Sequence, residues 1–574
     1  MYTLTTMATI QKKISRGYTY WQIVESRRVN GKPRPIVLAH LGTAAGLLQR
    51  LQQGPGKPLK AKVLQFGGLA ALWNIAEELK VVETIDRFVP KRDQGLSCGQ
   101  YMLLAALNRC VSPTSKASLY DWYRKTLLHR LLPAAKKALS SQRFWDHMDL
   151  VTDKAIAAIE NEWATRLVQD FHIDLRTLIF DATNFDTFID TKNPCTLVQR
   201  GHAKSKRSDL RILGLALLVS IDHDVPLLSH VYPGNQNDVT TFAQVTDSLV
   251  ARYQQFAKEC QHITLVFDGG NNSIDNIQKI DKSKYHFITS LTLTSHKDLL
   301  EVPLHEFKSF TDDDRLQGTV AYRTTKEIWG KNRTVVITRS DKLLEGQLAG
   351  IQQTLRKRRA ALHELRAKLR RSQEPNAKGK GYTPQSLQKH LDNLSSGQYI
   401  SSILKTQIVK TSKGGLDFTF ETDFKAYNEL KQTRLGKRIL CTDNDTWSTE
   451  EIILGSRAQS HAEDAFKQMK NPHWVSFSPN FHWTDQKLRV HAFYCVLALT
   501  LSALLRRKAA QAGINLSING LLEQLTDITE VINLYSPEGK KGSGKLRADY
   551  VLSEQSPLQE KLCAIFDIIK LRHR

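Results

Sequence analysis

Three acidic side chains in this chain are placed where they could hold a metal ion. Asp181 directly follows the strand-forming run 175–180, and Asp268 directly follows a second such run, 262–267. A carboxylate at the end of a buried strand is held by a rigid element yet open to a ligand, which suits a metal ligand or a catalytic acid. Each residue taken alone has an ordinary alternative, because an aspartate after a strand commonly starts a turn.

The third acid, Glu463, lies on a helix expected within residues 446–471. Four residues at helical spacing form the apolar face of this helix: Ala462, Ala465, Phe466 and Met469. Glu463, Lys467 and Lys470 follow one another at i, i+4 and i+7 on an adjacent polar face. A plain Glu–Lys pair on a solvated helix would show the same spacing, so the helix alone does not establish a site.

Carboxylates without accompanying His or Cys clusters favour Mg²⁺ (or Mn²⁺) over zinc, because these ions prefer hard oxygen ligands. Cleavage and transfer of a phosphodiester require an activated nucleophile, a stabilised leaving oxygen and neutralised charge at phosphorus. Two metal ions about 3.5–4 Å apart supply all three. The three carboxylates therefore predict a two-metal site for this chemistry, provided that the fold brings them together.

The order of elements in residues 171–300 indicates how the fold would do so. We expect a strand ending at Asp181, strands at 212–221 and 226–232, a helix from about Asp238, a strand at 262–267, a helix at 273–280 and a strand at 285–290. Three meandering strands followed by two crossover units make a mixed sheet flanked by helices. This is the strand order of the ribonuclease H-like fold, in which the first and fourth strands are neighbours, so Asp181 and Asp268 would face each other.

The remaining segments predict further units around this α/β core. Residues 1–60 read as a β unit with an Asn30-Gly31 hairpin turn. Residues 61–170 read as a helical region whose interleaved basic residues, among them Arg109 and Lys116, would either contact DNA phosphates or form solvated helix faces. Residues 301–445 read as an inserted subdomain of strands and a basic helical hairpin with a leucine heptad. That hairpin could form an interface or brace the insertion. Residues 446–510 complete the core, and 511–574 form a C-terminal region.

Composition points to a nucleic-acid partner. The chain has 81 Lys and Arg against 57 Asp and Glu, a net charge of +24, and a polyanion is the simplest partner for such an excess. No membrane partner is expected, because the longest apolar run, 491–505, is too short to span a bilayer and reads as a buried core helix. The seven scattered cysteines contain no CxxC pair, which fits a reducing cytoplasm.

Five stretches carry a resemblance to a known family: FDATNF (180–185), KSKRSDLR (204–211), PLLSHVYPGNQND (226–238), ITLVFDGGNNSIDN (263–276) and HAEDAFKQMK (461–470). The chain resembles the DDE transposases of bacterial insertion sequences, in the branch with a long insertion between the second Asp and the Glu. The separations fit this branch, with 87 residues between Asp181 and Asp268 and 195 between Asp268 and Glu463.

The resemblance implies roles for individual residues. Asp181, Asp268 and Glu463 would be the catalytic, metal-binding triad. Residues implied in DNA binding are Lys204, Lys206, Arg207, Trp329, Arg457, Lys467 and Lys470. In relatives an aromatic in the position suggested for Trp329 can hold a flipped base. The alternative is that Trp329 packs between strands. The family's Tyr and Arg before the Glu are replaced here by Ser456 and Gln459, and Arg457 could substitute for them.

The leading hypothesis is a transposase of the bacterial cytoplasm, associated with the nucleoid. It would bind the inverted-repeat ends of its element as a homodimer or higher oligomer, cleave them and transfer the strands to target DNA. One alternative is a nuclease on the same fold that never transfers strands. The other is a DNA-binding protein with a silent catalytic site. The nearby carboxylates Asp186, Asp222 and Asp224 have no predicted catalytic role, and turn formation accounts for the last two.

Overall fold

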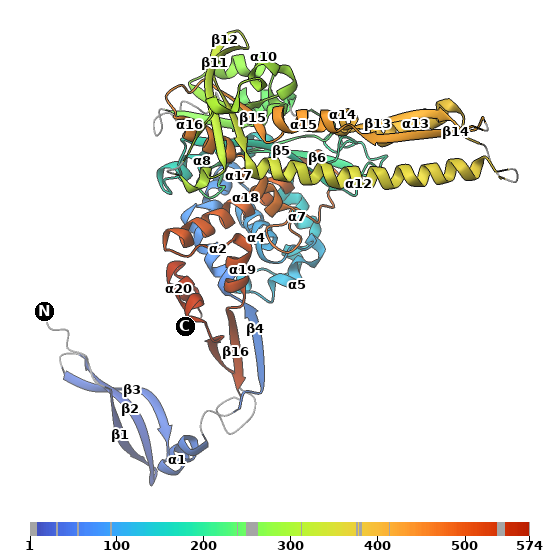
Figure 1. Cartoon of the computed structure of the whole chain (residues 1–574). Helices are drawn as coiled ribbons and strands as arrows, with labels where there is room; N and C mark the ends of the chain where they lie inside the picture. The colour runs from blue at the N-terminus through green and yellow to red at the C-terminus, as the bar shows by residue number, and fades with distance from the viewer. Residues whose placement is uncertain are drawn as a thin grey trace.

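The computed structural model describes residues 8–29, 32–53, 57–91, 95–237, 239–247, 262–310, 313–374, 377, 381–412, 414–535 and 546–572. Figure 1 shows a central sheet with a long projecting arm, a body of helices beside it, and a small sheet near the N-terminus. Asp238 lies outside the described residues, as does most of the helix expected to begin there.

The central sheet is mixed, and its nine described strands lie in the order β10-β11-β12-β15-β9-β8-β5-β6-β7. The strands are β5 (Thr177–Thr187), β6 (Arg211–Ser220), β7 (Pro226–Pro233), β8 (Ile263–Phe267), β9 (Tyr285–Leu291), β10 (Lys308–Ser309), β11 (Thr319–Ile328), β12 (Lys331–Ser340) and β15 (Lys437–Thr442). Strands β5, β6 and β7 form an antiparallel meander, and β5, β8 and β9 are parallel neighbours. The predicted adjacency of the first and fourth strands is therefore confirmed.

The apolar runs of the sequence explain why this sheet forms where it does. All ten residues of β6 and all five of β8 are buried, as expected for strands covered on both faces. Helices α10 (Ile274–Asp281), α16 (Thr449–Arg457) and α17 (Ser460–Met469) lie against the sheet, α16 on β9 and α17 on β5 and β6. The predicted α/β class, a large mixed sheet with helices, is confirmed.

One expectation for residues 301–445 needs correction. Strands β11 and β12 do not belong to a separate unit, because β12 pairs with β15 and β15 pairs with β9. They extend the central sheet instead. Only the chain between β12 and β15 leaves it.

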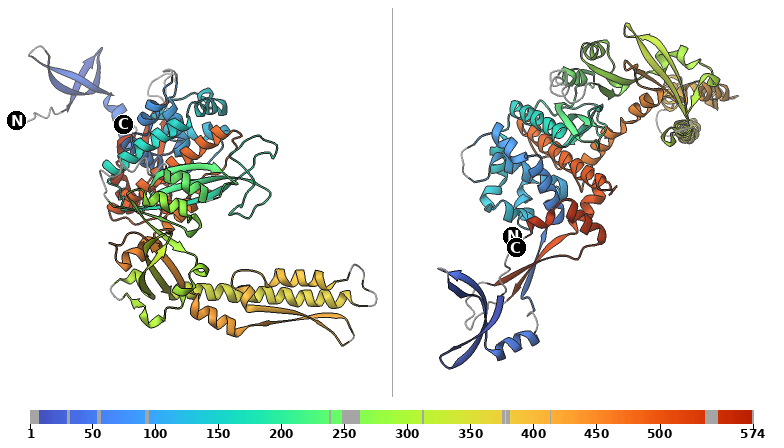
Figure 2. Two further views of the ribbon diagram at one scale, coloured as in Figure 1. Left: turned by 90° about the horizontal axis from the view of Figure 1, so that it is seen from above. Right: turned by 90° about the vertical axis from the view of Figure 1, so that its left-hand side faces the viewer.

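That chain, residues 341–436, is called the arm below. It contains α12 (Asp341–Ser372), α13 (Pro384–Ser395), α14 (Ile400–Ile403), β13 (Leu404–Lys410), β14 (Leu416–Thr422) and α15 (Phe424–Thr433). Helices α12 and α13 pack on each other, so the predicted helical hairpin is confirmed, and β14 packs along α12. Figures 1 and 2 show the arm extending away from the sheet.

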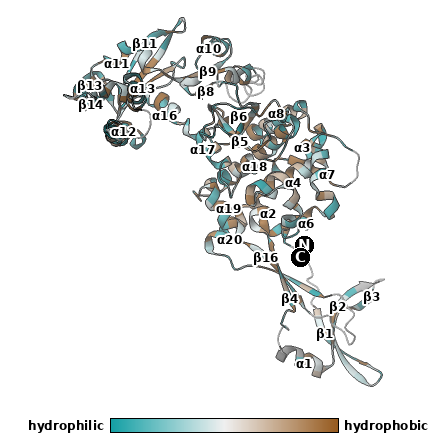
Figure 3. Cartoon of the chain, turned by 90° about the vertical axis from the view of Figure 1, so that its right-hand side faces the viewer, coloured by the Kyte–Doolittle hydropathy of each residue, from teal (hydrophilic) through white to brown (hydrophobic). Residues whose placement is uncertain are grey.

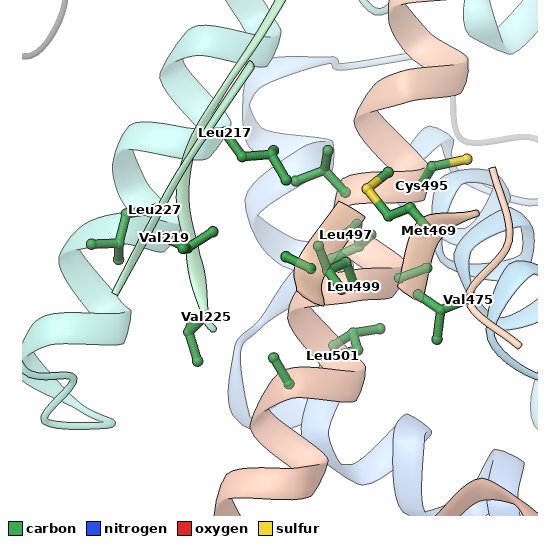
Figure 4. Packing of buried hydrophobic residues seen from close by; sticks show 14 of the residues in the cluster. Leu217, Val219, Val225, Leu227, Met469, Val475, Cys495, Leu497, Leu499 and Leu501 are labelled. Atoms are coloured by element: carbon green, nitrogen blue, oxygen red, sulfur yellow. The ribbon is translucent and has the colours of Figure 1, made fainter. Parts of the chain in front are cut away.

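The helical body packs around α18 (Asp485–Gln511). Its other helices are α2 (Gly67–Glu78), α3 (Val81–Phe88), α4 (Cys98–Val111), α5 (Leu119–Tyr123), α6 (Leu128–Leu131), α7 (Ser141–Met148), α8 (Asp153–Gln169), α19 (Ile518–Thr526) and α20 (Pro557–Ile565). Figure 4 shows Leu217 and Val219 of β6 beside Leu497 and Leu499 of α18. The helices and the sheet thus share one hydrophobic core.

This packing bears on two expectations. Among the described helices, α18 is long and apolar enough to cross a membrane, but 94% of its apolar window is buried inside the structure, so the prediction of a core helix is confirmed. Arg109 and Lys116 are also buried. They cannot meet DNA from there, and the prediction of phosphate contacts is wrong for these two residues.

The chain ends form two smaller sheets. Strands β1 (Ala8–Ser15), β2 (Tyr18–Val29) and β3 (Lys32–Gly42) form an antiparallel meander next to α1 (Ala44–Gln53); Asn30 and Gly31 lie outside the described residues. Strand β4 (Lys60–Gln65) pairs with β16 (Thr529–Tyr535), which also pairs with β17 (Arg547–Leu552). The C-terminal region therefore returns to the segment that links the N-terminal sheet to the helical body.

Candidate active site

Asp181 and Asp268 lie side by side on neighbouring strands. Ile179 pairs with Val266 in the parallel ladder of β5 and β8. Two residues further along, Asp181 lies within β5 and Asp268 directly follows the last residue of β8 in extended conformation. Side chains two residues apart point to the same face of a sheet, so both carboxylates project from one face. The sequence predicted Asp181 at the end of its strand. That prediction is wrong, because β5 continues past Asp181 and pairs it with Leu217 of β6.

The surroundings of Asp181 bring all three predicted carboxylates into electrostatic contact. Burial is the main cause that raises the pKa of Asp181, and the charges of Glu463 and Asp268 raise it further. The Lys204 ammonium and the Ala182 N–H, which donates to Asp181 Oδ1 at 2.8 Å, oppose this rise. A partly buried carboxylate that is repelled by two other negative charges is stabilised by any cation that binds among them.

Glu463 belongs to the helix that covers this face. The apolar side of α17 is buried as predicted, whereas Glu463 and Lys467 are exposed. Just past the end of the helix, Lys470 Nζ donates a hydrogen bond to Thr183 Oγ1 at 2.7 Å. Thr183 is two residues after Asp181 on β5, so this contact fixes α17 along the strand that carries the first carboxylate.

Asp224, which the sequence predicted only as a turn residue, anchors the start of α17. The buried Asp224 accepts hydrogen bonds from His461 Nδ1 and, at 2.9 Å, from Arg506 of α18. His223 and Asp224 both have φ of 61° in the turn between β6 and β7, so the turn prediction is correct but incomplete. The missed signal was His461, two residues before Glu463 in the motif.

Two of the predicted DNA-binding residues lie beside Asp181, and three others are exposed. Lys204 Nζ donates to the carbonyl of Ala182 at 2.6 Å, next to Asp181. Burial, and then the nearby Lys204, lower the pKa of Lys470. Lys206, Arg207 and Lys467 are exposed, and Arg207 is paired with Asp209 at 2.6 Å.

Arg457 is not brought to the carboxylates. Its guanidinium donates to the carbonyl of Arg315 and, at 2.6 Å, to Thr319 Oγ1 at the start of β11. Burial lowers the pKa of Arg457, and the like charge of Arg438 lowers it further. The suggestion that Arg457 substitutes for the missing family residues thus gains no support from its position.

Trp329 is also remote from the carboxylates. It lies in the turn between β11 and β12, where Trp329 and Gly330 have φ of 52° and 75°. Its ring packs on Phe287 near the start of β9, with centroids 6.1 Å apart, whereas Asp268 is level with the end of β9. Trp329 therefore packs against the sheet, in line with the alternative interpretation.

The donor set fits a hard divalent cation by chemistry, because all three side chains offer carboxylate oxygens. The geometry is open, however. In the part of the chain that the structure describes, no group of three or more His, Cys, Asp and Glu side chains is close enough to hold a metal ion. Binding at these residues therefore requires the carboxylates to draw together.

Comparison with known proteins identifies the family. Residues 173–501 match the family model described as "Transposase DDE domain", which covers the strands and the helix that carry all three carboxylates. The chain belongs to the DDE transposases. Residues 8–53 of this transposase match the N-terminal domain of IS1634 family transposases, so the resemblance to insertion-sequence transposases is confirmed.

Other comparisons add little. The transposase is similar to a solved piggyBac transposase in a synaptic complex with hairpin DNA, at 7% identity and a TM-score of 0.35, over 82% of each chain. That likeness is weak. No curated protein matches the transposase.

Proposed function

We propose that this transposase cleaves the inverted-repeat ends of its insertion sequence and transfers the strands to target DNA, using Asp181, Asp268 and Glu463 on a ribonuclease H-like sheet. The observation that carries the proposal is the shared row of Asp181 and Asp268 on β5 and β8, with Glu463 close enough to raise the pKa of Asp181. The family match supports the transposase activity in general.

The three carboxylates would hold two Mg²⁺ or Mn²⁺ ions. When bound, such ions neutralise charge at the scissile phosphate and activate the attacking oxygen. The carboxylates lie on different elements, β5, the end of β8, and α17. Asp181 is fixed by the sheet, whereas Asp268 and Glu463 are exposed.

The lysines beside the carboxylates would hold the DNA strand. Lys470 and Lys204 flank Asp181 on one face of β5, where their charges favour a phosphate near the carboxylates. Lys206, Arg207 and Lys467 would make the outer phosphate contacts. Arg457 and Trp329 are left out, because both are engaged with other parts of the protein.

The DNA partners follow from the same reaction. We infer that the protein binds double-stranded inverted-repeat ends and then target DNA, as a homodimer or higher oligomer, beside the nucleoid in the bacterial cytoplasm. The net charge of +24 supports a polyanionic partner.

Purified variants test the carboxylates. Asp181→Asn, Asp268→Asn and Glu463→Gln should each lose Mg²⁺-dependent cleavage of duplex DNA carrying the ends of the element, while binding to that DNA stays within about twofold. The matched control is Asp464→Asn, exposed next to Glu463. Full cleavage by any triad variant would remove that residue from the site.

The same assay separates the proposal from a nuclease. Strand-transfer products joined to a supercoiled plasmid are expected from the wild-type protein. Cleavage without such products would favour the nuclease, and binding without any cleavage would favour a silent DNA-binding protein.

A further inference from the structure

The arm is basic and stands clear of the rest of the molecule. Residues 341–436 contain 18 Lys and Arg against nine Asp and Glu. Helix α12 runs along the arm for 32 residues, which is about 48 Å. Figure 2 shows that α12 leaves the central sheet at its beginning and continues outward with α13, β13 and β14 along one side.

The leucine heptad of α12 is buried within the arm. Leu362 and Leu369 of α12 are fully buried, as are Leu387 and Leu391 of α13, and Phe418 of β14 completes the same cluster. This cluster is separate from the main core. The heptad therefore gives the arm its own core and offers no apolar seam to a second chain, which decides between the two roles that the sequence left open.

The basic side chains of α12 fall into two groups. Those directed at β14 have partners within the arm, since Arg359 bonds Thr422 at 2.6 Å and Arg370 pairs with Asp417 at 3.2 Å. Arg356, Lys357 and Arg371 are exposed and form no ion pair or side-chain hydrogen bond with a described residue. Internal pairing thus leaves these three cations free.

The free cations lie along the outward side of the helix. Lys357 and Arg371 recur at helical spacing on one face, with Arg356 beside them. The acid on this face, Glu364, is paired with Lys368 at 2.7 Å. Figure 3 colours α12 largely as hydrophilic, and among described residues α12 exposes no large hydrophobic side chain.

We propose that the outer face of α12 binds the phosphate backbone of duplex DNA. The inference rests on the proposed function and adds a DNA contact surface away from the carboxylates. Three unpaired cations on a rigid helix suit phosphates, and 48 Å corresponds to about 14 base pairs of B-form DNA. A surface without large apolar groups does not suit a protein interface core. Such contacts position the DNA and read no sequence.

The test is the salt dependence of DNA binding by the full-length protein. The triple variant Arg356→Ala, Lys357→Ala, Arg371→Ala is compared with the wild type on a random-sequence duplex of about 40 base pairs, longer than α12. The slope of log K against log salt should become shallower by about 0.9 per lost phosphate contact, hence by about 2.7. A matched control is Lys154→Ala, Lys282→Ala, Lys561→Ala, three exposed lysines outside the arm, whose slope should not change.

An unchanged slope in the triple variant, with an unchanged melting temperature, would overturn the inference. So would a change of oligomeric state on sedimentation without a change in slope, because it would make a second copy the partner of this face. Failure of the proposed function is distinguishable. Glu463→Gln should keep the wild-type slope. If the wild-type protein shows no metal-dependent cleavage, the arm variant can still show a shallower slope than the wild type.

Discussion

Asp181 and Asp268 lie level with each other beside the central sheet, Asp181 within β5 and Asp268 directly after the adjacent parallel strand β8. The register of β5 and β8 alone sets this relationship, since the two residues are 87 positions apart, as are Ile179 and its partner Val266. Two carboxylates held this way repel each other, and Glu463 adds to the repulsion. The site is therefore poised to gain stability from a bound cation.

The first prediction concerns metal binding measured without activity. Mn²⁺ should stabilise the wild-type protein against unfolding by about 1.4 kcal/mol at ten times its Kd. The proposed function makes Asp181 and Asp268 ligands of the ion, so Asp181→Asn and Asp268→Asn should lose most of this gain. Differential scanning calorimetry with Mn²⁺ and with a chelator measures it. Asp464→Asn should behave as the wild type, and an equal gain in all variants would contradict the site.

The second prediction concerns pH. The pKa of Asp181 is raised, chiefly by burial, and Lys204 holds it lower than it would otherwise be. Metal binding needs the ionised carboxylate, so it should weaken as pH falls through this raised pKa. Lys204→Gln removes a cation that lowers the pKa, and it should move the acid limb of Mg²⁺-dependent cleavage to higher pH. Single-turnover rates against pH measure the shift.

Lys206→Gln provides the comparison for this shift, because Lys206 is exposed nearby and is not among the charges that act on Asp181. Its acid limb should coincide with that of the wild type. A movement of the Lys204→Gln limb to lower pH would contradict the electrostatic account of Asp181.

The third prediction concerns the anchor of α17. Asp224→Ala leaves Arg506 and His461 without their shared partner, and it should lower the free energy of unfolding by about 2 kcal/mol. This value is below that of a fully buried pair, because the Arg506 side chain is 24% exposed. Urea denaturation followed by circular dichroism measures it. Asp464→Ala, which removes an exposed carboxylate from α17, should change the stability by less than about 0.5 kcal/mol.

The fourth prediction concerns the buried Lys116. Its Nζ has no hydrogen-bond partner among the described residues and lies 4.3 Å from the ring centre of Tyr494. Burial, reinforced by Arg109, lowers the pKa of Lys116 well below 10.5. The folded protein therefore binds this proton more weakly than the unfolded chain does, and stability should rise with pH between the lowered pKa and 10.5.

Lys116→Met should abolish that rise and stabilise the protein at pH 7 by about 1 kcal/mol, because no buried amine must lose its proton on folding. Urea titrations at pH 7 and 9.5 measure both effects. Lys154→Met, at an exposed position, should leave the pH dependence unchanged. A destabilised Lys116→Met protein would indicate that the ring contact outweighs the cost of burial.

Local sequence patterns predict the core strands, the Glu463 helix and the three candidate carboxylates. Continuous apolar runs specify β6 and β8, and the i, i+3, i+4, i+7 spacing specifies the buried face of α17, because both patterns are local. The strand order also followed, since a meander and two crossovers leave few arrangements.

Which distant segments meet depends on long-range packing. The pairing of β12 with β15, and of β4 with β16, joins segments far apart in sequence, and no local periodicity encodes such partners. Strand pairing also explains why Asp181 lies inside β5. The strand β5 stays paired with β6 beyond Ile179, which is its last residue paired with β8. The burial of Arg109 and Lys116 and the position of Trp329 depend on the same long-range packing. Residue type marks a side chain as basic or aromatic, but its neighbours in space decide whether it faces DNA or the core.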